Sequence, residues 1–163
     1  MMSKHQDMLY CDYKARGFEP YGEEQERIFE WMQTKRRLPL GEAKDFELGS
    51  LRVSDHRFHW FAAHDLPDRL FPPLPSEGPV TGATARRFKG HIAPGGPIYV
   101  NHPGKGTTLW LSPELIDFDV RHRISINNKV VSTGFVEPAL EALLEDLRLR
   151  GDRERLFWAR LTY

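Results

Sequence analysis

The chain contains 163 residues, 40% of them hydrophobic and 12% aromatic, which is enough apolar material for one domain with a packed core. Its 23 Lys and Arg residues balance its 23 Asp and Glu residues, so the formal net charge is zero. Because a domain that holds a phosphate backbone usually carries a basic excess, this balance argues against nucleic acid binding.

The N-terminal segment shows no targeting signal. Met1–Lys14 lacks the apolar stretch of a signal peptide, and no run of the chain reaches the roughly 18 apolar residues of a membrane span. The single cysteine, Cys11, excludes an internal disulfide and a cysteine-based zinc cage. We therefore expect no membrane partner, and the sequence leaves the compartment open.

A strand followed by a helix is predicted near the N-terminus. Met8–Tyr13 has the composition of a short strand. Gly22–Arg37 is predicted to be a helix, because apolar residues recur at spacings of three and four between acidic first turns and a basic last turn. The apolar face of this helix contains Ile28, Phe29, Trp31 and Met32.

The apolar period then changes from 3.6 residues to two, which is typical of strands. The alternation in Phe46–Val53 slips at Gly49-Ser50, and this slip predicts a β-bulge. Every second residue of Phe58–Ala62 is apolar in the same way, which predicts the next strand. Five prolines in Pro67–Pro79 predict a loop, because proline cannot donate to a strand ladder.

The second half of the chain is predicted to contain more strands and one late helix. Asn127-Asn128 is predicted to be a two-residue hairpin turn, because asparagine tolerates a positive φ. A helix is expected over Pro138–Arg150, with Gly151 just past its end. Its predicted buried stripe is Leu140, Leu143, Leu144 and Leu147. The expected strands are Thr81–His91, Pro97–Asn101, Thr107–Leu111, Arg121–Ile126 and Leu156–Tyr163.

This order of elements predicts a mainly β fold. Short strands separated by turn signals are typical of an antiparallel, immunoglobulin-like β-sandwich, here with an N-terminal strand-helix segment and one late helix. We place the boundary between the strand-helix segment and the sandwich at about residue 40, giving segments 1–40 and 41–163.

Motifs that would identify an enzyme are weak or absent. No serine lies in the G-x-S-x-G setting of an α/β-hydrolase nucleophile. Gly104–Thr108 lacks the leading glycine of a phosphate loop and is interpreted as a hairpin connection. The pairs Asp117 with Asp119 and Glu145 with Asp146 are read as solvated carboxylates. We therefore predict no catalytic residue, no metal and no cofactor.

The histidines offer one alternative. His56, His59 and His64 lie close to Asp65, and an unrecognised hydrolase or metal site could be built from them. His56 and His59 are three apart on a predicted strand, so their side chains should leave opposite faces. The structural interpretation is therefore preferred, and the hydrolase hypothesis stays open.

Aromatic residues on strands are the candidate binding surface. A row of exposed rings on a sandwich face would suit a sugar or a protein partner, although rings on alternating strands more often belong to the core. The candidates are Trp60, Tyr99, Trp110 and Trp158. A carbohydrate-binding module is the alternative function that these residues favour.

Two segments carry a family resemblance: Tyr13–Arg37, with the pattern YKARGFEPYGEE before the helix, and Leu109–Ala159, which includes LWLSPELIDF and RISINNK. Together they resemble the C-terminal portion of bacterial peptidase or esterase-like proteins of the α/β-hydrolase superfamily, of the prolyl-oligopeptidase-related kind. The resemblance implies that segment 1–40 corresponds to the last strand and helix of a hydrolase domain and that a β-sandwich follows it.

The same resemblance implies that the reactive groups lie elsewhere. The family's nucleophile and acid would precede this chain, and its histidine would follow a glycine where this sequence has Gly17-Phe18. No catalytic residue is carried over, and the chain is interpreted as a non-catalytic accessory or interaction domain. The helix face formed by Ile28, Phe29, Trp31 and Met32 would then need a cover, because burying four large side chains contributes about 6–10 kcal/mol. The sandwich, a second copy or a parent hydrolase domain could provide it.

Overall fold

The computed structural model describes residues 14, 17, 22–36, 39–50, 54–67 and 85–163. The chain divides into two compact units, residues 1–37 and 38–163, three residues before the predicted boundary. The predicted strand Met8–Tyr13 and most of the predicted loop Pro67–Pro79 lie outside the described residues.

The described part of the first unit is a short helix with apolar residues on one face. A 3-10 turn, η1 (Gly22–Glu24), leads into α1 (Gln25–Gln33), which confirms the predicted helix but ends it four residues early. The hydroxyl of Thr34 donates to the carbonyl of Trp31 at 2.7 Å, and this contact closes the last turn. None of the described α1 side chains is buried against the described residues of its own unit.

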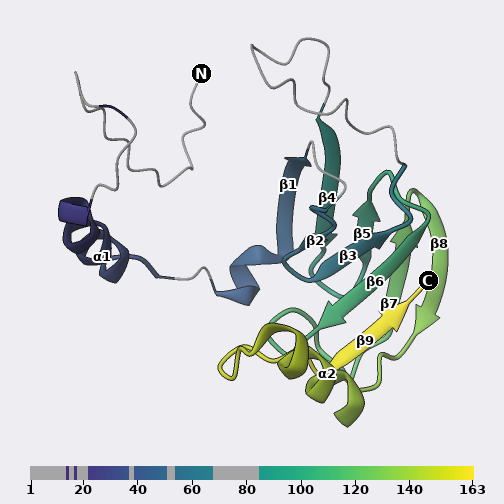
Figure 1. The fold of residues 1–163 in the computed structure, drawn as a ribbon. Coiled ribbons are helices and arrows are strands. Elements are labelled where there is room, and N and C mark those ends of the chain that lie inside the picture. The colour runs from purple at the N-terminus through teal and green to yellow at the C-terminus, as the bar shows by residue number, and fades with distance from the viewer. Residues whose placement is uncertain (1–13, 15–16, 18–21, 37–38, 51–53, 68–84) are drawn as a thin grey trace. The chain divides into compact units, whose positions relative to one another are not determined.

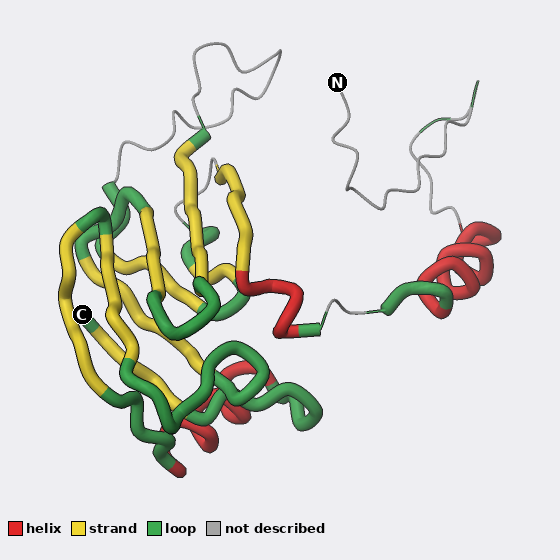
Figure 2. Tube along the Cα trace, turned by 180° about the vertical axis from the view of Figure 1, so that it is seen from behind, coloured by secondary structure: helices red, strands yellow, loops and turns green. Residues whose placement is uncertain are grey.

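The second unit is mainly β, as predicted, with two layered sheets (Figures 1 and 2). It begins with a 3-10 turn, η2 (Leu40–Lys44), and its one described α-helix, α2 (Leu140–Arg150), lies beside the start of the last strand. Neither described α-helix is long and apolar enough to cross a membrane. The larger sheet has the order β1 (Asp45–Ser50), β4 (Arg86–Ile92), β5 (Ile98–Asn101), β7 (His122–Ile126), β8 (Lys129–Gly134). The smaller sheet has the order β2 (Arg57–Phe58), β3 (Phe61–His64), β6 (Gly106–Leu111), β9 (Ala159–Thr162).

One strand pair departs from the predicted antiparallel arrangement. β5 and β7 are parallel, with Tyr99 opposite Ser125, while the other strand pairs described are antiparallel. The strand between them in the sequence, β6, belongs to the other sheet. The chain therefore crosses over before it returns to the first sheet, and such a crossover allows a parallel pair.

The core lies between the sheets and is built from alternating strand residues. Along β5, Ile98 and Val100 are fully buried while Tyr99 between them is exposed. Phe46 packs against Phe61 and Trp60, with ring centroids 5.5 and 5.7 Å apart. The core residues shared between the sheets include Trp60, Phe61, Phe88, Ile98, Val100, Leu109, Leu111 and Ile124.

The predicted strand over Phe58–Ala62 is wrong, because a turn interrupts it. Phe58 at the end of β2 pairs with Phe61 at the start of β3, so His59 and Trp60 form the tight turn, with His59 at φ +46°. The indole N–H of Trp60 donates to the carbonyl of Ala43 at 2.8 Å. Because the indole N–H has this buried acceptor, Trp60 can lie in the core although its backbone is in a turn. The alternation of apolar residues does not predict this.

The predicted bulge at Gly49-Ser50 is also wrong. The β1–β4 register runs without a shift from Asp45 to Ser50, and the buried residue at its end is Ser50. The pleat is regular over Asp45–Ser50, and Leu51 and Val53, whose alternation suggested the slip, lie outside the described residues. A register shift is instead found between Ile124 and Ser125 on β7.

The predicted Asn127-Asn128 turn is confirmed. The two residues have φ values of +49° and +66°, and Ile126 pairs with Lys129 across them. Positive φ at both central residues matches the right-handed twist of the flanking strands. The asparagine pair therefore sets the β7–β8 register at this end.

The helix α2 is confirmed but begins at Leu140, two residues later than predicted. Half of the predicted stripe is wrong, because Leu143 and Leu147 are partly buried but Leu140 and Leu144 are not. Leu140 and Leu144 are 66% and 54% exposed, and the buried residues are Ala142 and Asp146. Gly151 ends the helix at φ +65°, as predicted, with its N–H bonded to the carbonyl of Leu147. The reason for the rotated face is the buried carboxylate of Asp146.

Candidate ligand-binding pocket

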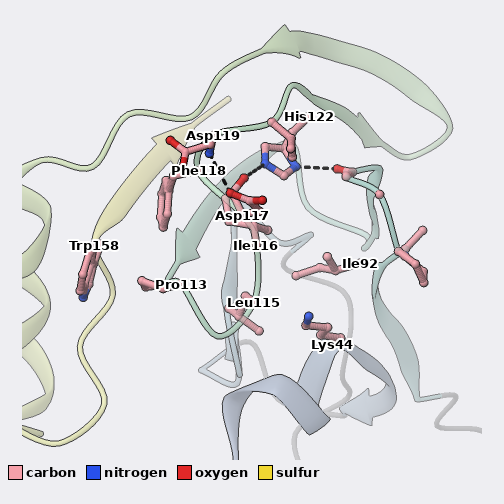
Figure 3. A pocket seen from close by; sticks show the side chains of 15 residues that line it. Lys44, Ile92, Pro113, Leu115, Ile116, Asp117, Phe118, Asp119, His122 and Trp158 are labelled. Atoms are coloured by element: carbon pink, nitrogen blue, oxygen red, sulfur yellow. Dashed lines mark hydrogen bonds between the residues drawn. The ribbon is translucent and has the colours of Figure 1, made fainter.

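A cavity of about 780 Å³ opens at one end of the second unit. We call it the Trp158 pocket. Its walls are the turn between β4 and β5, residues 92–96, the loop between β6 and β7, residues 113–120, and the two side chains of His122 and Trp158, with Lys44 at the margin (Figure 3). This volume lies within the range of about 300–1,000 Å³ that is usual for small-molecule sites.

Glycines in the β4–β5 turn let its backbone lie close to the segment before β7. Gly95 and Gly96 have φ values of +85° and +118°, which side chains rarely adopt. A Cβ on Gly96 would lie 2.9 Å from the carbonyl oxygen of Arg121. Ala93 donates to the carbonyl of Pro97 at 2.9 Å, so the turn is closed by the backbone itself.

The β6–β7 loop is equally ordered by local bonds. The carbonyl of Ser112 accepts from the N–H groups of Leu115 and Ile116 at 3.0 and 3.1 Å. The carboxylate of Asp117 accepts from the N–H of Asp119 at 2.9 Å, an Asx-type turn. Leu115 and Ile116 are buried and form the apolar floor.

His122 joins the two walls. Its ring is 1% exposed, with Nδ1 2.8 Å from the carbonyl oxygen of Gly96 and Nε2 2.7 Å from the carbonyl oxygen of Asp117 (Figure 3). The ring thus connects the β4–β5 turn to the β6–β7 loop. This connection fixes the two segments relative to each other.

Trp158 and Phe118 form the aromatic wall. Their rings are nearly parallel, at 19°, with centroids 6.4 Å apart, and Trp158 is 45% exposed. Both polar groups of the Trp158 backbone are hydrogen-bonded. Its N–H donates to the carbonyl of Leu111 at 2.7 Å, and its carbonyl accepts from the N–H of Ala139 at 2.8 Å. Figure 3 shows these rings on the side of the pocket away from Lys44.

The chemistry of the pocket is therefore amphipathic. An exposed indole face offers apolar contact, and the exposed carboxylates of Asp117 and Asp119 can accept hydrogen bonds close to it. A ligand with one flat apolar side and several hydroxyl or amine donors fits this arrangement.

The structure separates the four predicted aromatic candidates. Trp60 and Trp110 are 0% and 4% exposed, so neither presents a ring face to a ligand, and the expectation of a row of four rings is corrected. They are buried because Trp60 fills the space between the sheets and Trp110 is covered by Arg57 and Phe157, 4.7 and 6.4 Å from its ring. Tyr99 is exposed but stacks with His91, with centroids 5.8 Å apart. Trp158 alone of the four lines the pocket.

The histidines of the alternative hydrolase or metal site each contact another part of the fold. His56 lies before β2 with Nδ1 2.8 Å from the carbonyl oxygen of Ser54, and His59 lies in the turn against Phe46 at 4.8 Å. Burial lowers the pKa of His59. His64 ends β3, and its Nε2 lies 2.8 Å from the hydroxyl of Thr108, which is itself buried. Across the described ranges, no three His, Cys, Asp or Glu side chains are placed to share a metal ion.

A second buried histidine was not predicted. The Nδ1 atom of His102 accepts from the N–H of Gly104 at 3.1 Å, so Nε2 carries the hydrogen that Thr107 receives at 2.6 Å. Burial, with a smaller contribution from nearby His64, lowers the pKa of His102 to about 4. The ring therefore stabilises the β5–β6 connection in its neutral form.

Asp146 is a buried carboxylate that the sequence analysis assigned to solvent. It is 0% exposed and accepts from Arg57 at 3.0 Å, from Nε of Arg150 at 2.6 Å and from the N–H of Phe157 at 3.1 Å. It thereby connects α2 to β2 and to the segment that carries Trp158. No apolar pattern marks such a residue, because Arg150 lies four residues away on the same helix but Arg57 lies 89 residues away in the sequence.

The pocket residues Phe118 and His122 were also missed. A signal for Phe118 did exist, because an aromatic residue between two aspartates in a loop is unusual for a core position. His122 gave no signal of this kind, since its partners are backbone carbonyls.

Comparison with known proteins adds no relative. No protein-family model, no curated protein and no solved structure matches the chain.

Proposed function

We propose that this chain is a non-catalytic accessory module that binds a ligand in the Trp158 pocket. The observation that carries the proposal is the exposed, backbone-anchored indole of Trp158, stacked on Phe118 at the mouth of a cavity of about 780 Å³. The histidines considered for hydrolysis support the fold: His56 contacts a backbone carbonyl and His64 a buried hydroxyl. The residues of the pocket are suited to holding a molecule by stacking and hydrogen bonding.

Carbohydrate is the ligand class that the pocket favours. A pyranose ring presents a flat face of C–H groups, which suits the indole, and a rim of hydroxyls, which suits carboxylate acceptors. Asp117 and Asp119 supply such acceptors from the same loop as Phe118. The sequence suggested a row of several aligned rings as a sugar platform. The proposed site instead uses one exposed tryptophan, Trp158, in a concave pocket.

The first prediction concerns Trp158. Replacing Trp158 with alanine should reduce the affinity for a bound oligosaccharide by up to about tenfold, because contact with one aromatic face contributes about 0.5–1.5 kcal/mol. Isothermal titration with a panel of oligosaccharides would measure it. Tyr99→Ala is the matched control, since Tyr99 is 40% exposed but lies outside the pocket. Equal losses in both variants would count against the Trp158 pocket as the site.

The wider context that we propose is a hydrolase-like protein. The support is the resemblance of Tyr13–Arg37 and Leu109–Ala159 to the C-terminal portion of peptidase or esterase-like proteins of the α/β-hydrolase superfamily. In this reading α1 is the last helix of a hydrolase domain, and the second unit is the appended sandwich. The catalytic groups then belong to the parent enzyme.

The apolar face of α1 supports a partner. Ile28, Phe29 and Met32 are 41%, 60% and 53% exposed, while Trp31 is half-buried with Lys35 over its ring at 4.6 Å. Three neighbouring apolar side chains on one short helix are costly to leave in water. We propose that a second copy of this chain or the parent hydrolase domain covers them.

The second prediction tests this face. If a second copy covers α1, sedimentation velocity should show a dimer whose fraction rises with concentration, and Phe29→Glu together with Met32→Glu should abolish it. The matched control is Leu144→Glu, on an exposed apolar position of α2. A monomer at all concentrations that also fails to associate with a hydrolase domain would contradict the proposal.

A further inference from the structure

We infer that His122 is a positioning residue of the Trp158 pocket that acts as a buried imidazolium, holding both walls only while both ring nitrogens carry hydrogen. This inference rests on the proposed function for its effect on a ligand. The charge state itself rests on geometry alone.

The two contacts of the ring require two donors. Nδ1 lies 2.8 Å from the carbonyl oxygen of Gly96, and Nε2 lies 2.7 Å from that of Asp117. A carbonyl oxygen only accepts, and a neutral imidazole has one N–H and one lone pair. In the neutral ring one lone pair would face an oxygen at hydrogen-bond distance, which is repulsive. Both contacts are satisfied together only by the doubly protonated ring.

The surroundings of the ring can tolerate this charge. The β6–β7 loop places the carboxylates of Asp117 and Asp119 on the same pocket, and η2 contributes Lys44 at its margin. The β4–β5 turn offers backbone only, with the Gly96 carbonyl as acceptor. Arg121 and Arg123 flank His122 along the chain, and Gly134 is its pair on β8. The two carbonyl bonds are charge-assisted and therefore stronger than bonds from a neutral ring.

The ring controls the shape of the pocket because it connects the two walls. The bond to Gly96 holds the β4–β5 turn, and the bond to Asp117 holds the loop that carries Phe118 and Asp119. When the ring loses one proton, one of the two bonds opens and the ring no longer joins the two walls, although each wall keeps its own local bonds. Phe118 then shifts relative to Trp158, and the stacking surface is weakened. Ligand affinity should therefore fall as the ring deprotonates.

Nitrogen-15 NMR of the uniformly labelled chain, with no ligand present, tests the charge state first. At low pH we expect both His122 ring nitrogens at the chemical shift of protonated imidazole, and as the pH rises we expect one of them to move to the unprotonated position together with the amide signal of Gly96 or Asp119. One nitrogen at the unprotonated position, while the Gly96 and Asp119 amides keep their native shifts, would overturn the inference.

Oligosaccharide titrations across the same pH range test the positioning role. As the pH rises, the affinity of the wild-type chain should fall about tenfold or more. The midpoint of this fall should coincide with the pH at which the His122 nitrogen shifts are half changed. His122→Gln, whose amide donates in one direction and does not titrate, should bind more weakly at low pH and show no such midpoint. An affinity that stays constant across the pH range in which the His122 nitrogen shifts change would overturn the positioning role. If no oligosaccharide binds and both nitrogens are protonated, the proposed ligand fails while the charge state of His122 stands.

Discussion

Replacing Asp146 with alanine is expected to lower the free energy of unfolding by about 3–5 kcal/mol, because breaking a buried ion pair leaves its partners uncompensated. The carboxylate is fully buried, while Arg57 and Arg150 are 26% and 25% exposed. The variant also leaves the N–H of Phe157 without its acceptor. Urea denaturation followed by circular dichroism would measure the loss.

The neighbouring residue supplies the control for this experiment. Glu145 forms an ion pair with Arg148 on the outer side of α2, at 2.7 Å, and the guanidinium of Arg148 lowers the pKa of Glu145. Surface pairs of this kind are screened by water and contribute little. Glu145→Ala should therefore leave the unfolding midpoint within experimental error. An Asp146→Ala midpoint equally close to wild type would show that the carboxylate does not anchor α2.

Acidification is expected to destabilise the fold through His102 by up to about 3 kcal/mol between pH 6.5 and pH 4. Burial lowers the pKa of His102 from 6.5 to about 4. Between these values His102 is protonated in the unfolded chain but neutral in the folded chain. The contribution of His102 to stability is complete above pH 6.5 and declines as the pH falls toward 4. Protonation would also remove the lone pair that accepts from Gly104.

Urea denaturation at a series of pH values, in wild type and in His102→Gln, isolates this effect from the titration of carboxylates. Glutamine can accept from Gly104 and donate to Thr107 without taking up a proton. The stability curves of the two proteins should converge as the pH falls from 6.5 to 4. Curves that stay parallel over this range would show that His102 takes up its proton equally in both states.

Much of the fold could be predicted from the sequence because local chemistry decides it. Asn127-Asn128 adopts positive φ because asparagine tolerates it, and Gly151 ends α2 in the left-handed conformation because glycine tolerates it too. Predictions failed where a tertiary partner overrides the local pattern. Asp146 rotates α2 away from its leucine stripe because two arginines and a backbone N–H meet it inside the fold.

The candidate site was only partly predictable. Trp158 was among the four aromatic candidates, but alternation could not separate it from Trp60 and Trp110, which are buried. Burial of each ring depends on what covers it, and the covering groups come from distant segments. His122 could not be found from the sequence, because its partners are the carbonyl oxygens of Gly96 and Asp117.

The most direct test of the account is two-dimensional NMR of the labelled chain, recorded repeatedly while an oligosaccharide panel is present. A binding module should show shifts confined to the indole of Trp158, the 92–96 turn and the 113–122 loop, with the signals of the sugar chemically unchanged over days. Cleavage products, or shifts centred on His56, His59 and His64 in place of the pocket, would contradict it.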